Sequence, residues 1–154
     1  MFRLILFEPE IPPNTGNIIR LCANTGTLLH LIRPLGFELD DRKLRRAGLD
    51  YREFAQVSVH DSLDECLDAL GRPRTLAIST RGTTAYHEHC YLPGDTLLLG
   101  PETRGLPESM LCSMEPACVL RIPMRPDNRS LNLSNAAAIV LYEAWRQQGF
   151  AGDG

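Results

Sequence analysis

Long apolar stretches are absent from this sequence. No run of hydrophobic residues approaches the roughly 20 residues that a membrane-spanning helix needs. Residues 1–9 are too few for a signal peptide and are typical of a β-strand that stops at a proline. We therefore expect a cytoplasmic protein, and the length of 154 residues favours a single domain over residues 1–154.

Paired cysteines are also missing. The five cysteines are odd in number, scattered, and never arranged as Cys-x-x-Cys, which argues against a disulfide framework and against a zinc ribbon. Residues 87–90 (His-Glu-His-Cys) are the only local group of potential metal ligands, and they lack the i, i+4 histidine spacing of a metal-binding helix. A solvated loop is the better interpretation, so we predict no metal site.

The common nucleotide-binding and hydrolase motifs do not occur. There is no Gly-x-Gly-x-x-Gly after the first predicted strand, no phosphate loop ending in Gly-Lys-Ser/Thr, and no Gly-x-Ser-x-Gly elbow. These absences argue against a standard dinucleotide dehydrogenase, a nucleoside triphosphatase and a serine hydrolase.

Lysine is nearly absent, because fifteen of the sixteen basic residues are arginine. The formal net charge of −3 does not point to nucleic acid, yet one basic cluster stands out at Arg42, Lys43, Arg45, Arg46 and Arg52. Guanidinium groups suit phosphate and guanine recognition. A solvated helix face, or an arginine-rich source, would give the same cluster, so both interpretations stay open.

Short apolar strands alternate with helices along the chain. Strands are predicted at residues 3–7, 28–32, 56–59, 75–79, 95–99 and 119–122. Helices are predicted at residues 14–26, with cap-type residues from Asn14, at 41–46, at 61–70 with Asp61 as the cap, at 108–113, and after residue 130. This alternation predicts an α/β fold with a mainly parallel sheet and helices on both faces.

Ligands of such sheets bind beyond the carboxyl ends of the strands. Three predicted loops follow the carboxyl ends of strands: the loop after Ile78, residues 100–105 and residues 122–130. The last of them leads into a helix start crowded with polar residues, namely Asn128, Ser130, Asn132, Ser134 and Asn135. A helix N-terminus favours an anionic group. An ordinary helix cap explains one of these residues but not the whole group.

The C-terminal helix is apolar nearly all round. One continuous stripe contains Leu133, Ala136, Ala137, Val140, Leu141, Ala144 and Trp145, and the other side carries Ala138, Ile139 and Tyr142. We expect this domain to cover one side and a second subunit to cover the other. A helix buried deeply in a monomer fits the periodicity equally well.

Arg20 is the only formally charged residue between Glu10 and Arg33. On a helix made otherwise of apolar and small polar residues, an isolated guanidinium is either a solubilising charge or a site residue. We favour a site residue.

Three segments together resemble the SPOUT superfamily of RNA methyltransferases: residues 13–20 (Pro-Asn-Thr-Gly-Asn-Ile-Ile-Arg), residues 98–107 (Leu-Leu-Gly-Pro-Glu-Thr-Arg-Gly-Leu-Pro), and residues 122–124 (Ile-Pro-Met) with 129–135 (Arg-Ser-Leu-Asn-Leu-Ser-Asn). Each segment is weakly specific, but their order and spacing are highly specific, and the similarity covers essentially the whole chain. Residues 45–51 and 142–146 make the sequence similar to the bacterial members that methylate the wobble ribose of leucine tRNAs.

The resemblance implies a deep trefoil knot near the C-terminus, an S-adenosylmethionine pocket formed by that knot, and an obligate homodimer. It implies that the cofactor lies against backbone groups of Ile78, Gly100 and Ile122, with Ser130 and Leu131 from the last loop. These positions match the strand ends selected above.

The resemblance assigns the loss of the ribose proton to Arg20. A guanidinium is normally only a donor, so a second reading is that Arg20 clamps a phosphate and stabilises the alkoxide while a phosphate oxygen or water takes the proton. Arg129, Tyr142 and Arg46 are candidates for contact with the anticodon stem-loop of leucine tRNAs, although Tyr142 fits dimer packing equally well. Glu102 is a candidate to orient Arg20 or Arg129, with a simple loop ion pair as the alternative.

Rival functions stay open at this stage. The chain could act on another RNA such as rRNA, it could be a knotted RNA-binding protein without catalysis, or it could methylate a small molecule.

Overall fold

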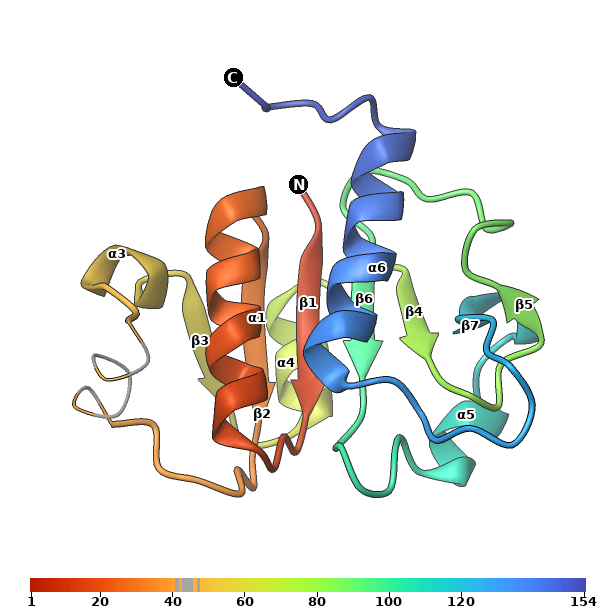
Figure 1. The fold of residues 1–154 in the computed structure, drawn as a ribbon, viewed down its shortest axis with the longest axis horizontal. Coiled ribbons are helices and arrows are strands. Elements are labelled where there is room, and N and C mark those ends of the chain that lie inside the picture. The colour runs from red at the N-terminus through yellow and green to blue at the C-terminus, as the bar shows by residue number, and fades with distance from the viewer. Residues whose placement is uncertain (41, 43–45, 47) are drawn as a thin grey trace.

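The computed structural model describes residues 1–40, 42, 46 and 48–154, and within them one parallel seven-stranded sheet forms the centre of the protein (Figure 1). The strand order is β3-β2-β1-β6-β4-β7-β5, and the pairs are parallel. The strands are β1 (Arg3–Phe7), β2 (Leu28–Ile32), β3 (Val57–His60), β4 (Thr75–Ile78), β5 (Thr84–Ala85), β6 (Thr96–Leu99) and β7 (Val119–Arg121). The predicted parallel α/β sheet is confirmed, and only the two-residue β5 was not predicted.

Helices cover both faces of the sheet. The long helices α1 (Pro12–Thr25) and α6 (Leu133–Gln147) lie side by side on one face, and α4 (Leu63–Ala69) with α5 (Glu108–Cys112) lies on the other (Figure 1). The short α3 (Tyr51–Phe54) contacts α1, and a 3₁₀ helix (Pro116–Cys118) precedes β7. The predicted basic helix at residues 41–46 falls mostly outside the described residues.

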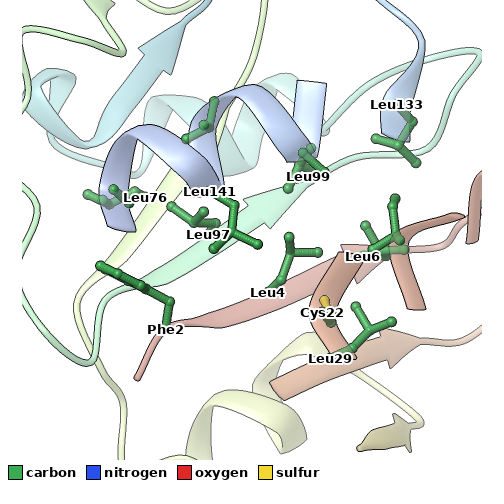
Figure 2. Close-up of a cluster of buried hydrophobic side chains, with 14 of the residues drawn as sticks. Phe2, Leu4, Leu6, Cys22, Leu29, Leu76, Leu97, Leu99, Leu133 and Leu141 are labelled. Carbon is green, nitrogen blue, oxygen red and sulfur yellow. The ribbon is translucent and has the colours of Figure 1, made fainter. Parts of the chain in front are cut away.

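The hydrophobic core is divided by the sheet into two clusters. Leu4 and Leu6 of β1 face the larger cluster beneath α1 and α6, whereas Ile5 between them faces the cluster beneath α4 and α5 (Figure 2). Successive side chains of a strand point to opposite faces, so a strand covered on both faces must be apolar throughout. This requirement explains why the central strands were recognisable in the sequence as short unbroken apolar runs.

Two helix starts differ from the prediction. Helix α1 begins at Pro12, two residues before Asn14, because a proline in the first turn lacks only an N–H that would have no helical partner. Asn14 therefore lies inside the helix and is not its cap. Helix α4 is capped by Ser62 and not by Asp61: the Ser62 hydroxyl accepts from the Glu65 backbone N–H at 3.1 Å.

The C-terminal helix α6 begins within the predicted group of polar residues, and one of them, Asn132, is its N-cap. The Asn132 side-chain carbonyl accepts from the backbone N–H groups of Ser134 (2.9 Å) and Asn135 (3.4 Å) and caps α6. Leu133, Val140 and Leu141 are buried against the sheet, whereas Ile139 and Tyr142 are exposed. The described part of the chain thus covers only one side of this helix.

An ion pair between the buried Asp95 and the partly exposed Arg74 (38% exposed) ties β6 to the preceding chain. The Asp95 side chain is 3% exposed; it accepts from Arg74 Nη2 at 2.5 Å, Arg74 Nε at 2.8 Å and the Leu92 backbone N–H at 2.8 Å. We expect Asp95→Asn to lower the free energy of unfolding by about 2 kcal/mol, since the change removes the charge of a buried carboxylate and leaves its partners poorly matched. Urea denaturation followed by circular dichroism measures this change.

The matched control for Asp95 is Asp68→Asn, which removes a carboxylate that pairs with Arg72 on the exposed side of α4. An exposed pair of this kind contributes at most about 0.5 kcal/mol. Equal losses in the two variants would contradict the structural role assigned to Asp95.

Candidate active site

A cavity of about 430 Å³ opens at the carboxyl ends of β4, β6 and β7. Its walls come from the segments that follow these strands and from the beginnings of α1 and α6. All five residues predicted to hold a cofactor line it: Ile78, Gly100, Ile122, Ser130 and Leu131. The structure therefore brings together residues that are 53 positions apart in the sequence. The side chains of Leu99, Leu106, Leu133 and Ala136 add apolar surface, which suits a flat, neutral ring.

Gly100 is required by the close approach of its own loop. A Cβ at this position would lie 2.4 Å from the backbone nitrogen of Leu106 and 2.5 Å from the carbonyl carbon of Gly105. The loop turns back here because the Gly105 N–H donates to the Pro101 carbonyl at 2.9 Å. A side chain on Gly100 would displace this wall of the cavity.

A chain of polar contacts joins three walls of the cavity. Asn132 Nδ2 donates to Asn14 Oδ1 at 2.9 Å, and Asn14 Nδ2 donates to Glu102 Oε1 at 3.5 Å. The Glu102 carboxylate also accepts from the backbone N–H groups of Glu10 (2.7 Å) and Ile11 (3.2 Å) at the start of α1. Sequence reasoning missed the part that Asn14 plays, because a residue inside a helix gives no sign of a partner 118 residues away.

These contacts revise the interpretation of Glu102. Its carboxylate binds the N-terminus of α1, where helix N–H groups favour negative charge, and it contacts neither Arg20 nor Arg129 among the described interactions. Within the described part of a single chain Glu102 orients neither arginine, and its contact with an arginine of a second protomer stays a prediction. The carboxylate instead fixes the loop after β6 against α1.

A second carboxylate fastens the same loop. Glu10 Oε1 accepts from the backbone N–H of Thr103 at 3.0 Å and from the Thr103 hydroxyl at 2.8 Å. The backbone hydrogen bond and then the hydroxyl hydrogen bond hold the pKa of Glu10 below its usual value. Arg104 Nη2 pairs with Glu8 Oε2 at 2.7 Å. The loop after β6 is therefore held to the segment between β1 and α1 at several points.

Arg20 lies in a different hollow. It projects from α1 into a pocket of about 390 Å³ that is also lined by Pro13, Asn17, Phe37 and Leu49. Within the described part of the chain, Arg20 is not among the residues that line the first cavity. A single chain thus keeps the predicted catalytic residue apart from the predicted cofactor residues.

The guanidinium of Arg20 is held by the segment around α3. Its Nε donates to Glu53 Oε1 at 3.3 Å, and its Nη2 donates to the Gly48 carbonyl. Glu53 is itself fixed, because its other oxygen accepts from the Asp50 backbone N–H at 2.8 Å. About half of the Arg20 side chain stays exposed, so the group is oriented and still accessible to a ligand.

The three residues predicted to contact RNA lie on three separate segments. Arg129 is exposed in the loop beside Ser130, and Arg46 is exposed within a stretch whose neighbours Lys43 and Arg45 fall outside the described residues. Tyr142 is 43% exposed on α6, where its ring meets Trp145 edge-on with centroids 5.7 Å apart. All three side chains are exposed, so each is accessible to a ligand.

Fold and cavity together define an α/β protein with a ligand pocket at the carboxyl edge of a parallel sheet, built by the loops after β4, β6 and β7. Among the residues that the structure describes, no helix has the length and apolar character to cross a membrane. The model of the SpoU rRNA Methylase family matches residues 1–142, and the chain belongs to that family. The resemblance found in the sequence is thereby confirmed.

One protein and two solved structures show what members of this family resemble the chain. The tRNA (cytidine(34)-2'-O)-methyltransferase of Saccharophagus degradans is 60% identical over 152 residues, with 99% of each chain covered. A solved structure described as "Structural insights into the 2-OH methylation of C/U34 on tRNA" is 48% identical, with a TM-score of 0.89 and 97% of each chain covered. An AdoMet-bound rRNA methyltransferase from Sinorhizobium meliloti is 26% identical, with a TM-score of 0.79, and the match covers 94% of this chain and 56% of that one.

Proposed function

We propose that this protein transfers the methyl group of S-adenosylmethionine to the ribose 2'-oxygen of nucleotide 34, the wobble nucleotide, of tRNA. The observation that carries the proposal is the 60% identity, over 99% of both chains, to a tRNA (cytidine(34)-2'-O)-methyltransferase. Leucine tRNAs, with cytidine or a modified uridine at this position, are the proposed substrates. We place the activity in one domain over residues 1–154 and in the cytoplasm, where bacterial tRNA is found.

The cavity at the carboxyl edge of the sheet is the proposed cofactor site. Its apolar walls and the backbone of the lining residues Ile78, Gly100 and Ile122 suit an adenine ring, which needs directional hydrogen bonds and little charge. Ser130 and Leu131 close it from the last loop. The bound cofactor supplies an electrophilic methyl group, and these residues orient it. The AdoMet-bound relative from Sinorhizobium meliloti supports this assignment.

We also propose that the C-terminal segment threads through an earlier loop and forms a trefoil knot. The supporting observations are that residues 122–133 share one cavity with residues 78–81 and 99–106, and that α6 then returns to the face of the sheet that carries α1. A crystal structure in which the chain is traced through residues 78–147 tests the knot directly. A backbone path that forms no knot would contradict the proposal.

A homodimer would complete the active site. The exposed side of α6 presents Ile139 and Tyr142, and the neighbouring α1 presents Asn17 and Arg20. Covering this apolar surface with a second copy would remove Ile139 from water. We propose that the same contact carries Arg20 of one protomer to the cofactor cavity of its partner, because a single chain keeps the two sites apart.

Arg20 is the proposed catalytic residue at that shared site. Methyl transfer is an in-line displacement, so the protein must align the 2'-oxygen with the methyl group and assist the loss of the hydroxyl proton. A guanidinium beside the ribose stabilises the developing alkoxide, and its planar fork can hold the adjacent phosphate at the same time. Exposed Arg129 and Arg46 are proposed to contact the anticodon stem-loop, and Tyr142 to contact either RNA or the partner.

Ile139→Asp is expected to dissociate the dimer. Ile139 is 36% exposed near the middle of the uncovered side of α6, and a carboxylate buried there between two protomers would be strongly unfavourable. Light scattering on a sizing column measures the mass. Leu92→Asp, at an apolar residue exposed elsewhere, is the control and should leave the mass unchanged. A dimeric Ile139→Asp variant would contradict the proposed interface.

Two inactive variants should restore each other if the site is shared. A heterodimer of Arg20→Ala and Gly100→Val chains contains one site with an intact cavity and an intact arginine. An equal random mixture should therefore recover about a quarter of wild-type activity. The two chains are coexpressed with different tags, and methyl transfer to tRNA is measured on the purified mixture. Activity no higher than in either variant alone would place cavity and arginine in the same chain.

The function itself is tested by supplying the purified protein with methyl-labelled S-adenosylmethionine and, in separate reactions, total tRNA that lacks the modification or ribosomal RNA. Nucleoside mass spectrometry should find the label as 2'-O-methylcytidine or a 2'-O-methylated uridine derivative. Label in ribosomal RNA only would reassign the substrate. Cofactor binding without transfer to either RNA would favour a non-catalytic RNA-binding protein.

A further inference from the structure

Two histidines and a cysteine meet on the far side of the sheet from the helix pair α1 and α6. His30 lies on β2, His60 ends the neighbouring edge strand β3, and Cys66 lies on α4 (Figure 1). His30 Nδ1 and His60 Nε2 are 3.0 Å apart, and one ligand atom from each of the three residues lies within 4.8 Å of the other two. The sequence did not reveal this cluster, because 36 residues separate His30 from Cys66.

The cluster is largely buried, and one nitrogen of His30, Nε2, has no hydrogen-bond partner among the described residues. His30 is 6% exposed and Cys66 is fully buried. Nε2 is not the ring nitrogen that faces His60, so a ligand is indicated by the other ring nitrogen, Nδ1, and by the proximity of the three side chains. His60 is only partly buried, so the cluster has one side through which a small ion can enter.

We propose that His30, His60 and Cys66 bind a zinc ion. Imidazole nitrogen and thiolate sulfur are the ligands that zinc takes most often, whereas calcium and magnesium prefer oxygen. Zn–N bonds of about 2.0 Å and a Zn–S bond of about 2.3 Å place tetrahedral ligand atoms about 3.5 Å apart. That separation lies between the 3.0 Å of the histidine pair and the 4.8 Å limit of the cluster, so small side-chain rotations suffice.

Binding replaces a hydrogen bond by metal bonds without oxidation or reduction. Each neutral imidazole supplies one unprotonated nitrogen, Cys66 binds as a thiolate after its proton leaves to solvent, and water takes the fourth position. The ion would connect the edge strand β3 to β2 and to α4, so its role is to stabilise this corner of the sheet.

The site is tested on the full-length protein, reduced and stripped with a chelator. Cobalt(II), which takes the same ligands, is the spectroscopic probe and is then displaced by zinc. We expect one ion per chain and a near-ultraviolet thiolate-to-cobalt absorption band. We also expect a zinc-dependent rise of several degrees in Tm, since an ion that binds only the folded state stabilises it.

Variants assign the ligands. Cys66→Ser should abolish the absorption band, and His60→Asn, at the partly exposed position, should weaken zinc binding at least about tenfold because one of three protein ligands is lost. Cys90→Ser, which changes the exposed cysteine of the sequence cluster at residues 87–90, is the control and should keep both the band and the affinity. Circular dichroism confirms that each variant is folded.

Three results would overturn the proposal: less than one ion per chain in the wild-type protein, a band that survives in Cys66→Ser, or a band lost in Cys90→Ser. None of these measurements uses methyl transfer. The zinc site and the proposed function are therefore tested independently of each other.

Discussion

Arg20→Ala is expected to abolish methyl transfer while leaving affinity for S-adenosylmethionine nearly unchanged. Among the described residues Arg20 does not line the proposed cofactor cavity of its own chain, and its guanidinium is held by Glu53 and the Gly48 carbonyl. Loss of the only cation proposed to stabilise the 2'-alkoxide should lower the single-turnover rate at least about 10³-fold. Rates are measured with tRNA under single-turnover conditions, and cofactor affinity is measured by calorimetry.

Two further variants sharpen this test. Arg20→Lys keeps the charge but loses the planar fork, and we expect at least about a 10²-fold loss of rate if the fork is needed. Arg33→Ala, which removes an exposed arginine that pairs with Asp61, is the matched control and should stay close to wild type. An Arg20→Ala enzyme within tenfold of the wild-type rate would remove Arg20 from the chemistry.

Gly100→Ala should abolish cofactor binding. The added Cβ would meet the backbone of Leu106 at 2.4 Å and of Gly105 at 2.5 Å, and neither backbone atom can turn aside as a side chain can. The loop must shift, and it is held to the β1–α1 segment through Glu102 and Glu10. We expect affinity for S-adenosylmethionine to fall at least about 100-fold, because the loop forms one wall of the cavity.

Gly105→Ala is the informative comparison for Gly100. A Cβ on Gly105 meets no atom of the described part of the chain within 4 Å, although its φ of +66° adds strain of roughly 1 kcal/mol for a side chain. The affinity of the Gly105→Ala variant for S-adenosylmethionine should therefore fall less than about tenfold. Calorimetry measures the affinity of both variants for S-adenosylmethionine, and circular dichroism establishes that both are folded. Gly100→Ala with wild-type affinity would contradict the assignment of the cavity to the cofactor.

The strands could be predicted because their environment imposes a simple pattern on the sequence. Leu4, Ile5 and Leu6 face alternate sides of the sheet, and since both sides are covered, all three are apolar. The strand ends at Ile78, Gly100 and Ile122 then followed from the rule that parallel sheets bind ligands at their carboxyl edge. The insertion of β6 between β1 and β4 could not be predicted, because strand order depends on long-range packing that leaves no periodic signal.

The sequence identified residues that line one cavity, but it did not identify the contacts that join the walls of that cavity. Asn14 was predicted to cap a helix, and Glu102 to pair with an arginine or to form a simple loop ion pair. Within one chain both residues join walls of the cavity through contacts to distant segments. The placement of Arg20 in a separate pocket also could not be foreseen, because a motif gives a residue's identity and not the direction in which its helix faces. The cluster of His30, His60 and Cys66 depends entirely on the folded sheet.

The most direct test of the central claim compares two leucine tRNAs that differ by one oxygen atom. One has an ordinary ribose at nucleotide 34 and the other has 2'-deoxyribose there, and each is incubated with labelled S-adenosylmethionine and the purified wild-type protein. The proposed function predicts label in the first tRNA, at nucleotide 34, and none in the second. Equal labelling of both tRNAs would show that the methyl group goes to another atom and would contradict the proposed function.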